Sequence, residues 1–259
     1  MKYLCIIRYV GTHFCGFQYQ PSRRTVQGAL TEAAEAVFGA PVLVTGCSRT
    51  DSGVHAEGFA LTLEPSESAA KIPPENLPLA FRQHLPPDLS LASARLVNAG
   101  FHPRYDARWK EYRYKIHASR VADPFLYQRV WHMPIPFLPD AVERMNAAAS
   151  HLLGTHDFSA FRSEGSPTHS PVRTVFECGV EREGDLYTVK IRGDGFLYNM
   201  VRIVTGTLVS VATGQLEPEA VARILASKKR PAAGPTAPPD GLSLYQVFYD
   251  EADFLKQTR

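Results

Sequence analysis

The order of strand-like and helix-like segments is the feature that most constrains how this chain can fold. In the first hundred residues, apolar runs and amphipathic stretches follow one another as β-α-β-β-α-β, and the rest of the chain repeats that order. Two such units predict an α+β protein made of duplicated ferredoxin-like folds, with helices packed on one face of largely antiparallel sheet. No residue-by-residue repeat accompanies the pattern, so the prediction depends on element order alone.

Local signals set the bounds of the predicted elements in the first unit. Thr25 is the expected N-cap of a helix that ends before Gly39. A second helix is expected around residues 75–84, after a linker-like stretch at 65–74. The predicted strands of this unit are residues 2–10, 42–47, 56–63 and 89–97.

The second unit is predicted in the same way. A helix opens at Pro139-Asp140 and ends at Gly154, and Glu183-Gly184-Asp185 forms the turn between two paired strands. Residues 228–241 are expected to be loop. The predicted strands are 110–118, 129–133, 172–182, 186–192 and 244–249, and the further helices are 196–213 and 217–227. These units predict an N-terminal α/β domain over residues 1–104 and a C-terminal one over 105–259.

Composition excludes several classes of protein. With 44% hydrophobic and 21% charged residues, the chain can bury a core, and no apolar run approaches the roughly 20 residues of a membrane helix. Four widely spaced cysteines without a C-x-x-C pair argue against a disulfide framework or zinc ribbon, and the cytoplasm is the expected compartment. A net charge of +2 neither requires nor excludes a nucleic-acid partner.

The stretch from Gly46 to His55 concentrates the groups that can do chemistry. It joins two predicted strands and holds one carboxylate, one guanidinium and several hydroxyls between two glycines. A simpler interpretation is a polar turn in which Asp51 bonds its own backbone. No G-K-[ST] follows, so the stretch is not a phosphate-binding P-loop.

Two other chemistries have weaker support from this stretch. A hydrolase using Ser52 and His55 lacks the glycine expected after the nucleophile stretch, where Val54 stands instead. A metal site would have to draw on residues whose spacing matches no known ligand pattern, namely Cys5, His13, Cys15, Cys47 and His55.

Five segments, in order along the chain, combine glycines, aromatic residues and arginines in characteristic patterns. They are Tyr9-Val10-Gly11-Thr12-His13-Phe14-Cys15-Gly16-Phe17-Gln18, Gly46-Cys47-Ser48-Arg49-Thr50-Asp51-Ser52-Gly53-Val54-His55-Ala56, Phe101-His102-Pro103-Arg104-Tyr105-Asp106-Ala107, Lys110-Glu111-Tyr112-Arg113-Tyr114, and Phe196-Leu197-Tyr198-Asn199-Met200-Val201-Arg202 followed by Gly206. Together they resemble the motifs of the tRNA pseudouridine synthase A family. Val10, Ser48 and Ser52 depart from the family's usual Asp, Gly and Ala.

The resemblance implies the pseudouridine synthase fold and a cofactor-free isomerase without a metal. The expected reaction converts uridine to pseudouridine at positions 38, 39 and 40 in the anticodon stem-loop of tRNA. The implied partners are tRNA and a second copy of the chain in a homodimer, with no membrane. The N-terminal domain would carry the catalytic Asp loop, and the C-terminal domain would complete the active-site cleft.

The resemblance also assigns roles to four residues. Asp51 is the expected catalytic residue, as nucleophile or base. Arg49 would pair with Asp51 and help hold the target nucleotide out of the stack. Tyr112 would stack on the uracil, and Arg202, near the start of a helix, would bring a second positive charge to Asp51 and keep it ionised.

Each assignment has a structural alternative. Tyr112 could be a core residue of its strand and Arg202 a surface arginine, whereas His55 is interpreted as structural rather than catalytic. Phe14, Phe17 and Tyr19 fit either a core or an RNA-stacking surface. The remaining basic candidates fit either solvated charges or phosphate contacts, namely Arg23, Arg24, Arg162, Arg173, Lys228, Lys229 and Arg230. A non-catalytic RNA-binding protein of tandem ferredoxin-like units is the alternative function.

Overall fold

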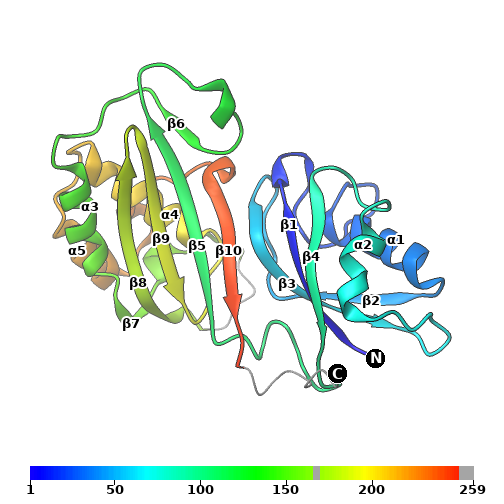
Figure 1. Ribbon diagram of the computed structural model, residues 1–259. Coiled ribbons are helices and arrows are strands. Elements are labelled where there is room, and N and C mark those ends of the chain that lie inside the picture. Colours follow the sequence, from blue (N-terminus) through cyan, green and yellow to red (C-terminus); the bar gives the residue numbers. More distant parts are fainter. Residues whose placement is uncertain (166–169, 251–259) are drawn as a thin grey trace. The chain divides into compact units, whose positions relative to one another are not determined.

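A computed structural model describes residues 1–165 and 170–250 (Figure 1). The chain divides into two compact units. One comprises Met1–Arg108 together with the chain from Leu244 onward, and the other comprises Trp109–Ser243. The division therefore falls between Arg108 and Trp109 and again within the last strand, β10 (Leu242–Phe248).

The first unit has the predicted β-α-β-β-α-β order. Its elements are β1 (Tyr3–Tyr9), α1 (Val26–Phe38), β2 (Val42–Gly46), β3 (His55–Pro65), α2 (Leu77–Phe81) and β4 (Leu89–Leu96). The strands lie in the order β4-β1-β3-β2 and pair antiparallel, with Tyr3 of β1 opposite Leu63 of β3 and Leu96 of β4. The predicted ferredoxin-like unit is confirmed.

The helices of this unit cover one face of its sheet (Figure 1). Helix α1 begins where predicted, because the Thr25 hydroxyl accepts a hydrogen bond from the Gly28 N–H at 3.2 Å. It ends at Gly39, which takes a left-handed conformation at φ 65°. The buried rings of Tyr3, Phe38 and Phe81 contact one another in series from β1 through α1 to α2, which forms the centre of this core.

The second unit is also built on an antiparallel sheet. Its elements up to β10 are β5 (Trp109–Ala118), β6 (Trp131–Met133), α3 (Ala141–Ser150), β7 (Gly154–Asp157), β8 (Val172–Glu183), β9 (Leu186–Gly193), α4 (Met200–Ala212) and α5 (Ala220–Ser227). Strands β5, β9, β8 and β7 are neighbours in that order and antiparallel, and β6 pairs parallel with β5. The sheet order confirms the largely antiparallel α+β prediction.

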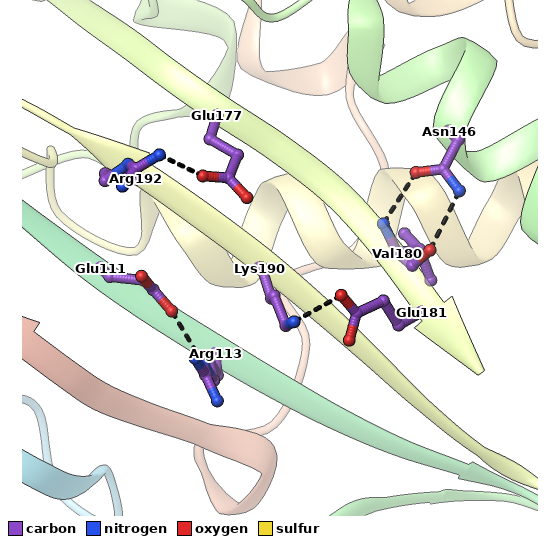
Figure 2. Close-up of polar contacts among 8 residues, drawn as sticks. All are labelled: Glu111, Arg113, Asn146, Glu177, Val180, Glu181, Lys190 and Arg192. Carbon is purple, nitrogen blue, oxygen red and sulfur yellow. Dashed lines mark hydrogen bonds and ion pairs between the residues drawn. The ribbon is translucent and has the colours of Figure 1, made fainter. Parts of the chain in front are cut away.

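The two faces of this second sheet differ in chemistry. On the helix side, the Asn146 side chain of α3 accepts from the Val180 N–H at 2.8 Å and donates to the Val180 carbonyl at 3.0 Å, which ties the helix to β8 (Figure 2). Because side chains alternate along a strand, the residues of β5, β8 and β9 that form ion pairs project to the other face. Three ion pairs lie along these strands in Figure 2, namely Glu111–Arg113, Glu177–Arg192 and Glu181–Lys190.

The structure corrects several predicted bounds. Helix α4 begins at Met200 rather than Phe196, because Asn199 takes a left-handed conformation that no helix interior adopts. Helix α3 ends at Ser150, and Gly154 opens β7, a strand that the sequence did not predict. The region around residues 75–84 holds a 3-10 turn and the short α2, and two 3-10 turns interrupt the predicted 228–241 loop.

Within the described ranges, no helix has the length and apolar character to cross a membrane. The longest, α1 and α4, have 13 residues each, whereas a span needs roughly 20.

Candidate functional site

Asp51 lies in the connection between β2 and β3, where anchored and accessible residues alternate. Thr50, Gly53 and Val54 are buried, whereas Arg49 and Ser52 are exposed and Asp51 is partly exposed. A backbone hydrogen bond from the Val54 N–H to the Asp51 carbonyl, 3.2 Å long, closes the turn. The carboxylate is thus carried on a short segment whose buried neighbours limit its movement.

The segment from Tyr9 to Gln18, called the clamp below, forms hydrogen bonds to the Asp51 loop. The Tyr9 hydroxyl and the Thr50 hydroxyl are 2.8 Å apart, and the Phe17 N–H donates to the Thr50 carbonyl at 3.1 Å. On the other side of Asp51, the Gly53 N–H donates to the Phe14 carbonyl at 3.3 Å. The first and second sequence motifs therefore form one hydrogen-bonded assembly.

The two segments approach each other closely at Gly11. Its N–H donates to Nδ1 of His55 at 2.9 Å. A β-carbon at this position would lie only 1.9 Å from the Val54 carbonyl oxygen. His55 itself is 6% exposed. The structural interpretation of His55 is therefore confirmed, because its ring holds the clamp against the start of β3.

The hydrolase alternative loses support at this loop. The Ser52 hydroxyl donates to the Phe14 carbonyl at 3.2 Å, and Nδ1 of His55 is occupied by Gly11. The Ser52 hydroxyl and Nδ1 of His55 thus both bond to backbone groups. Among the residues that the structure describes, no group of three or more His, Cys, Asp or Glu side chains is placed to hold a metal ion, and the four cysteines are free.

The aromatic residues Phe14 and Phe17 of the clamp belong to the core, whereas Tyr19, just after it, does not. Phe14 and Phe17 are buried, and the Phe17 ring stacks on Phe59 of β3 with centroids 4.4 Å apart. Tyr19 is 61% exposed. The core interpretation is thus correct for Phe14 and Phe17, while Tyr19 is left as the accessible ring of the three.

Arg24 has a structural partner in the first unit. Its guanidinium donates two hydrogen bonds to the carboxylate of Asp88, at 2.9 and 2.6 Å, and lies over the Phe14 ring at 4.0 Å. The hydrogen bonds from Arg24 hold the pKa of Asp88 below its usual value. Arg24 therefore supports the clamp, although it is exposed, as is the neighbouring Arg23.

In the second unit, Tyr112 and Tyr114 project from the same side of β5. Tyr114 is fully buried, and its hydroxyl donates to the Pro238 carbonyl at 2.6 Å, so burial raises the pKa of this phenol. Tyr112 is 8% exposed and meets the Phe196 ring edge to face, with centroids 5.1 Å apart. Tyr114 is a core residue, and Phe196 fixes the orientation of the Tyr112 ring.

Arg202 lies in the first turn of α4, near the helix start as predicted. Its Nε donates to the Ala237 carbonyl at 2.7 Å, and its Nη1 donates to Oδ1 of Asn199 at 2.8 Å. The side chain is only partly exposed. This guanidinium is therefore held in a defined orientation, unlike that of a freely solvated surface arginine.

The segment from residue 228 to 241, called the strap below, supplies the carbonyl that Arg202 contacts. Arg230 donates to the carbonyls of Ala233 and Gly234, at 3.4 and 3.0 Å, and to the Thr236 hydroxyl at 3.1 Å. A β-carbon at Gly206 of α4 would meet the Pro235 carbonyl oxygen at 1.9 Å, so the strap lies directly on the helix. Arg230 thus organises the segment that presents the Ala237 carbonyl to Arg202.

Other basic candidates also bond to protein groups. Lys228 pairs with Asp157 at 3.0 Å, and Arg173 donates to the Ser170 and Val172 carbonyls. Hydrogen bonds from Ser159 and then from Lys228 lower the pKa of Asp157. Lys229 is exposed. Lys228 and Arg173 therefore have partners within the protein, although the Lys228 side chain is 61% exposed.

Sequence reasoning missed the residues that hold the predicted site residues in place. Sequence patterns assigned Tyr9 and Asn199 no positioning role, although Tyr9 contacts Thr50 beside Asp51 and Asn199 contacts Arg202. Arg230 was considered only as a solvated charge or a phosphate contact, whereas it bonds within the segment that presents Ala237 to Arg202. For Asn199 a signal existed, because an asparagine just before a helical pattern often marks the true start of the helix. Tyr9 and Arg230 gave no such signal.

Comparison with known proteins adds to this picture. The family described as "tRNA pseudouridine synthase" matches residues 5–106 and 148–250. "tRNA pseudouridine synthase A" of Thermoanaerobacter sp. (strain X514) is 42% identical over 95% of this chain and 98% of its own length. The protein of the same name from Halalkalibacterium halodurans is 44% identical over 91% of this chain and 88% of its own length.

The family match covers residues of both units of the α+β fold. The chain belongs to the tRNA pseudouridine synthase family. The resemblance noted from the five motifs is confirmed.

Proposed function

We propose that this chain isomerises uridine to pseudouridine in tRNA, at positions 38, 39 and 40 of the anticodon stem-loop, with Asp51 as the catalytic nucleophile. Membership of the family and the names of its relatives support the reaction and the substrate. The reaction breaks the N1–C1′ bond, turns the uracil and joins C5 to C1′; C5 loses a proton and N1 gains one. Substrate and product therefore have the same composition, and no co-substrate is consumed.

The placement of Asp51 is the observation that carries this proposal. A nucleophile must keep its position while the sugar becomes electron-poor, and misplacement by about 1 Å can reduce the rate 100-fold. Asp51 is partly exposed, yet it lies between Thr50 and Gly53, which are both fixed by backbone contacts to the clamp. The loop thus combines access for a nucleotide with restricted movement.

The other three residues are assigned to the target nucleotide. Because the reacting atoms cannot be reached within a duplex, the uridine has to leave the stack. Arg49, exposed on the Asp51 loop, is proposed to hold it there, and Tyr112 to stack on the uracil. Arg202 is proposed to supply positive charge that keeps Asp51 ionised.

The test uses tRNA labelled with tritium at uridine C5, because the isomerisation releases that tritium. Asp51→Asn keeps the shape of the side chain and removes its charge. We expect it to bind tRNA like the wild type and to lose about 10³-fold or more in rate. Asp185→Asn, in the exposed β8–β9 turn, is the matched control and should react normally.

Two outcomes would contradict the proposal. If Asp51→Asn keeps a rate within tenfold of the wild type, Asp51 is not the nucleophile. If the wild-type protein binds tRNA but releases no tritium, the alternative of a non-catalytic RNA-binding protein replaces the synthase.

We further propose that the protein works in the cytoplasm as a two-fold symmetric homodimer, because the resemblance implies one and because a net charge of +2 gives one chain limited attraction for a folded tRNA. Sedimentation at assay concentrations tests the dimer. A fully active monomer would exclude it.

A further inference from the structure

The Arg202 guanidinium donates hydrogen bonds to two acceptors through different nitrogens. Nε donates to the Ala237 carbonyl on the strap, and Nη1 donates to Oδ1 of Asn199. A long arginine side chain has several rotatable bonds, so a single contact would leave its planar fork free to swing. Two contacts through different nitrogens set the direction in which the fork points.

Asn199 has an unusual backbone conformation. Its backbone is left-handed, with φ 60° and ψ 8°, and it directly precedes α4. An asparagine at this position ordinarily accepts a hydrogen bond from a backbone N–H of the first helical turn, but Asn199 makes no such cap. Its side chain is instead directed to Arg202 and Ser163.

Ser163 determines which way the Asn199 amide faces. Nδ2 of Asn199 donates to the Ser163 hydroxyl at 3.0 Å, and the Ser163 N–H donates to the Tyr198 carbonyl at 3.2 Å. A flipped amide would place its NH₂ group against the donating Nη1 of Arg202. Two donors cannot bond each other, so only the observed orientation satisfies both neighbours.

We infer that Asn199 is a positioning residue for the reaction, whose amide aligns the Arg202 guanidinium for the target nucleotide. This inference rests on the proposed function, in which Arg202 acts on the substrate site. The left-handed backbone of Asn199 costs some stability, and its side chain does not cap the helix. Such local losses of stability are expected where a residue serves the function.

Asn199→Gly tests the amide without disturbing the backbone, since glycine adopts a positive φ freely. We expect kcat for tritium release to fall on the order of 10- to 100-fold, the value of one hydrogen bond to a charged group. KM for tRNA should stay within about threefold, because the charge of Arg202 remains. Asn199→Asp, which keeps an oxygen acceptor, should retain most of the activity.

Two controls separate positioning from folding. Gln128 also has a left-handed backbone, with φ 56°, so Gln128→Gly repeats the same backbone change at another place in the second unit. It should leave kcat unchanged. In an Arg202→Lys background the Nη1 donor is absent. There Asn199→Gly should reduce kcat by less than about threefold further, because the two substitutions remove the same interaction.

The inference is overturned if Asn199→Gly has a kcat within threefold of the wild type, or if its effect persists in full in the Arg202→Lys background. These results leave wild-type tritium release intact. Failure of the proposed function, in contrast, would abolish tritium release by the wild type itself.

Discussion

Replacing Gly11 with alanine should displace the Asp51 loop while the first unit remains folded. The added β-carbon would lie 1.9 Å from the Val54 carbonyl oxygen and 2.5 Å from the Val54 carbonyl carbon. Ordinary contacts begin at 3.4 Å. The two segments therefore have to separate by the difference between 3.4 Å and 1.9 Å, about 1.5 Å, before the contact is tolerated. Gly11 has no positive φ, so the clash is the only obstacle to alanine.

The expected loss of activity depends on which groups move when the Gly11 and Val54 backbones separate. Val54 closes the Asp51 turn, and His55 accepts the Gly11 N–H, so movement at this contact is passed directly to the carboxylate. A misplacement of about 1 Å can cost 100-fold in rate, and we expect kcat to fall by at least about that factor. Overpacking should reduce the free energy of unfolding by about 1–3 kcal/mol, which a domain of ordinary stability survives.

The assay compares tritium release by Gly11→Ala with that by Gly100→Ala. Gly100 lies in the same unit, and a β-carbon there meets nothing within 4 Å. Urea unfolding of both variants establishes that they are folded under assay conditions. If Gly11→Ala, although folded, releases tritium within threefold of Gly100→Ala, the clamp does not determine the position of Asp51 and the reasoning fails.

Two other predictions concern binding and pH. Tyr112→Phe keeps the stacking ring and should retain most tRNA affinity while slowing catalysis, whereas Tyr112→Ala should also weaken binding by about 1–3 kcal/mol; equal affinities of the two variants by filter binding would exclude stacking. Because Arg24 lowers the pKa of Asp88 in the folded protein, the pair stabilises the fold above the unfolded aspartate pKa of about 3.9, and this stabilisation is lost as the pH falls through the lower folded value. Because Arg24 is 42% exposed, Asp88→Asn should lower the free energy of unfolding in urea by only about 0.5–1 kcal/mol at pH 7 and not at all in strong acid. An equal loss of stability at both pH values would contradict this assignment.

The sequence predicted those parts of the fold that depend on neighbouring residues. Helix α1 was bounded correctly because Thr25 and Gly39, a cap and a stop, both act locally. The start of α4 was predicted too early because the apolar pattern continues back to Phe196, although an asparagine just before Met200 is a typical sign of a helix start. Strand β7 was missed because Gly-Thr-His-Asp has no alternation of its own and is a strand only through pairing with β8.

The candidate site divides in the same way. The Asp51 loop was visible because its residue types are unusual for a strand connection. The clamp was not, because the contact between Tyr9 and Thr50 joins residues 41 positions apart and depends on the pairing of β1 with β3. Sequence patterns indicated the groups available for chemistry, while the residues that fix their orientation required coordinates.

The position of β10 has a consequence for the newly made chain. Strand β3 neighbours β10, and a β-carbon at Gly58 would lie 2.4 Å from the Tyr245 carbonyl oxygen, so the two backbones nearly touch. The end of β4 at Leu96 and the end of β10 at Phe248 are separated by about 150 residues, which take about 8–30 s to synthesise. During that time the edge of β3 that follows the Asp51 loop has no partner from β10, and an open edge invites pairing with other chains. A fragment ending near residue 104 would keep that open edge permanently, so aggregation is its expected fate, and this protein has to be expressed as one chain.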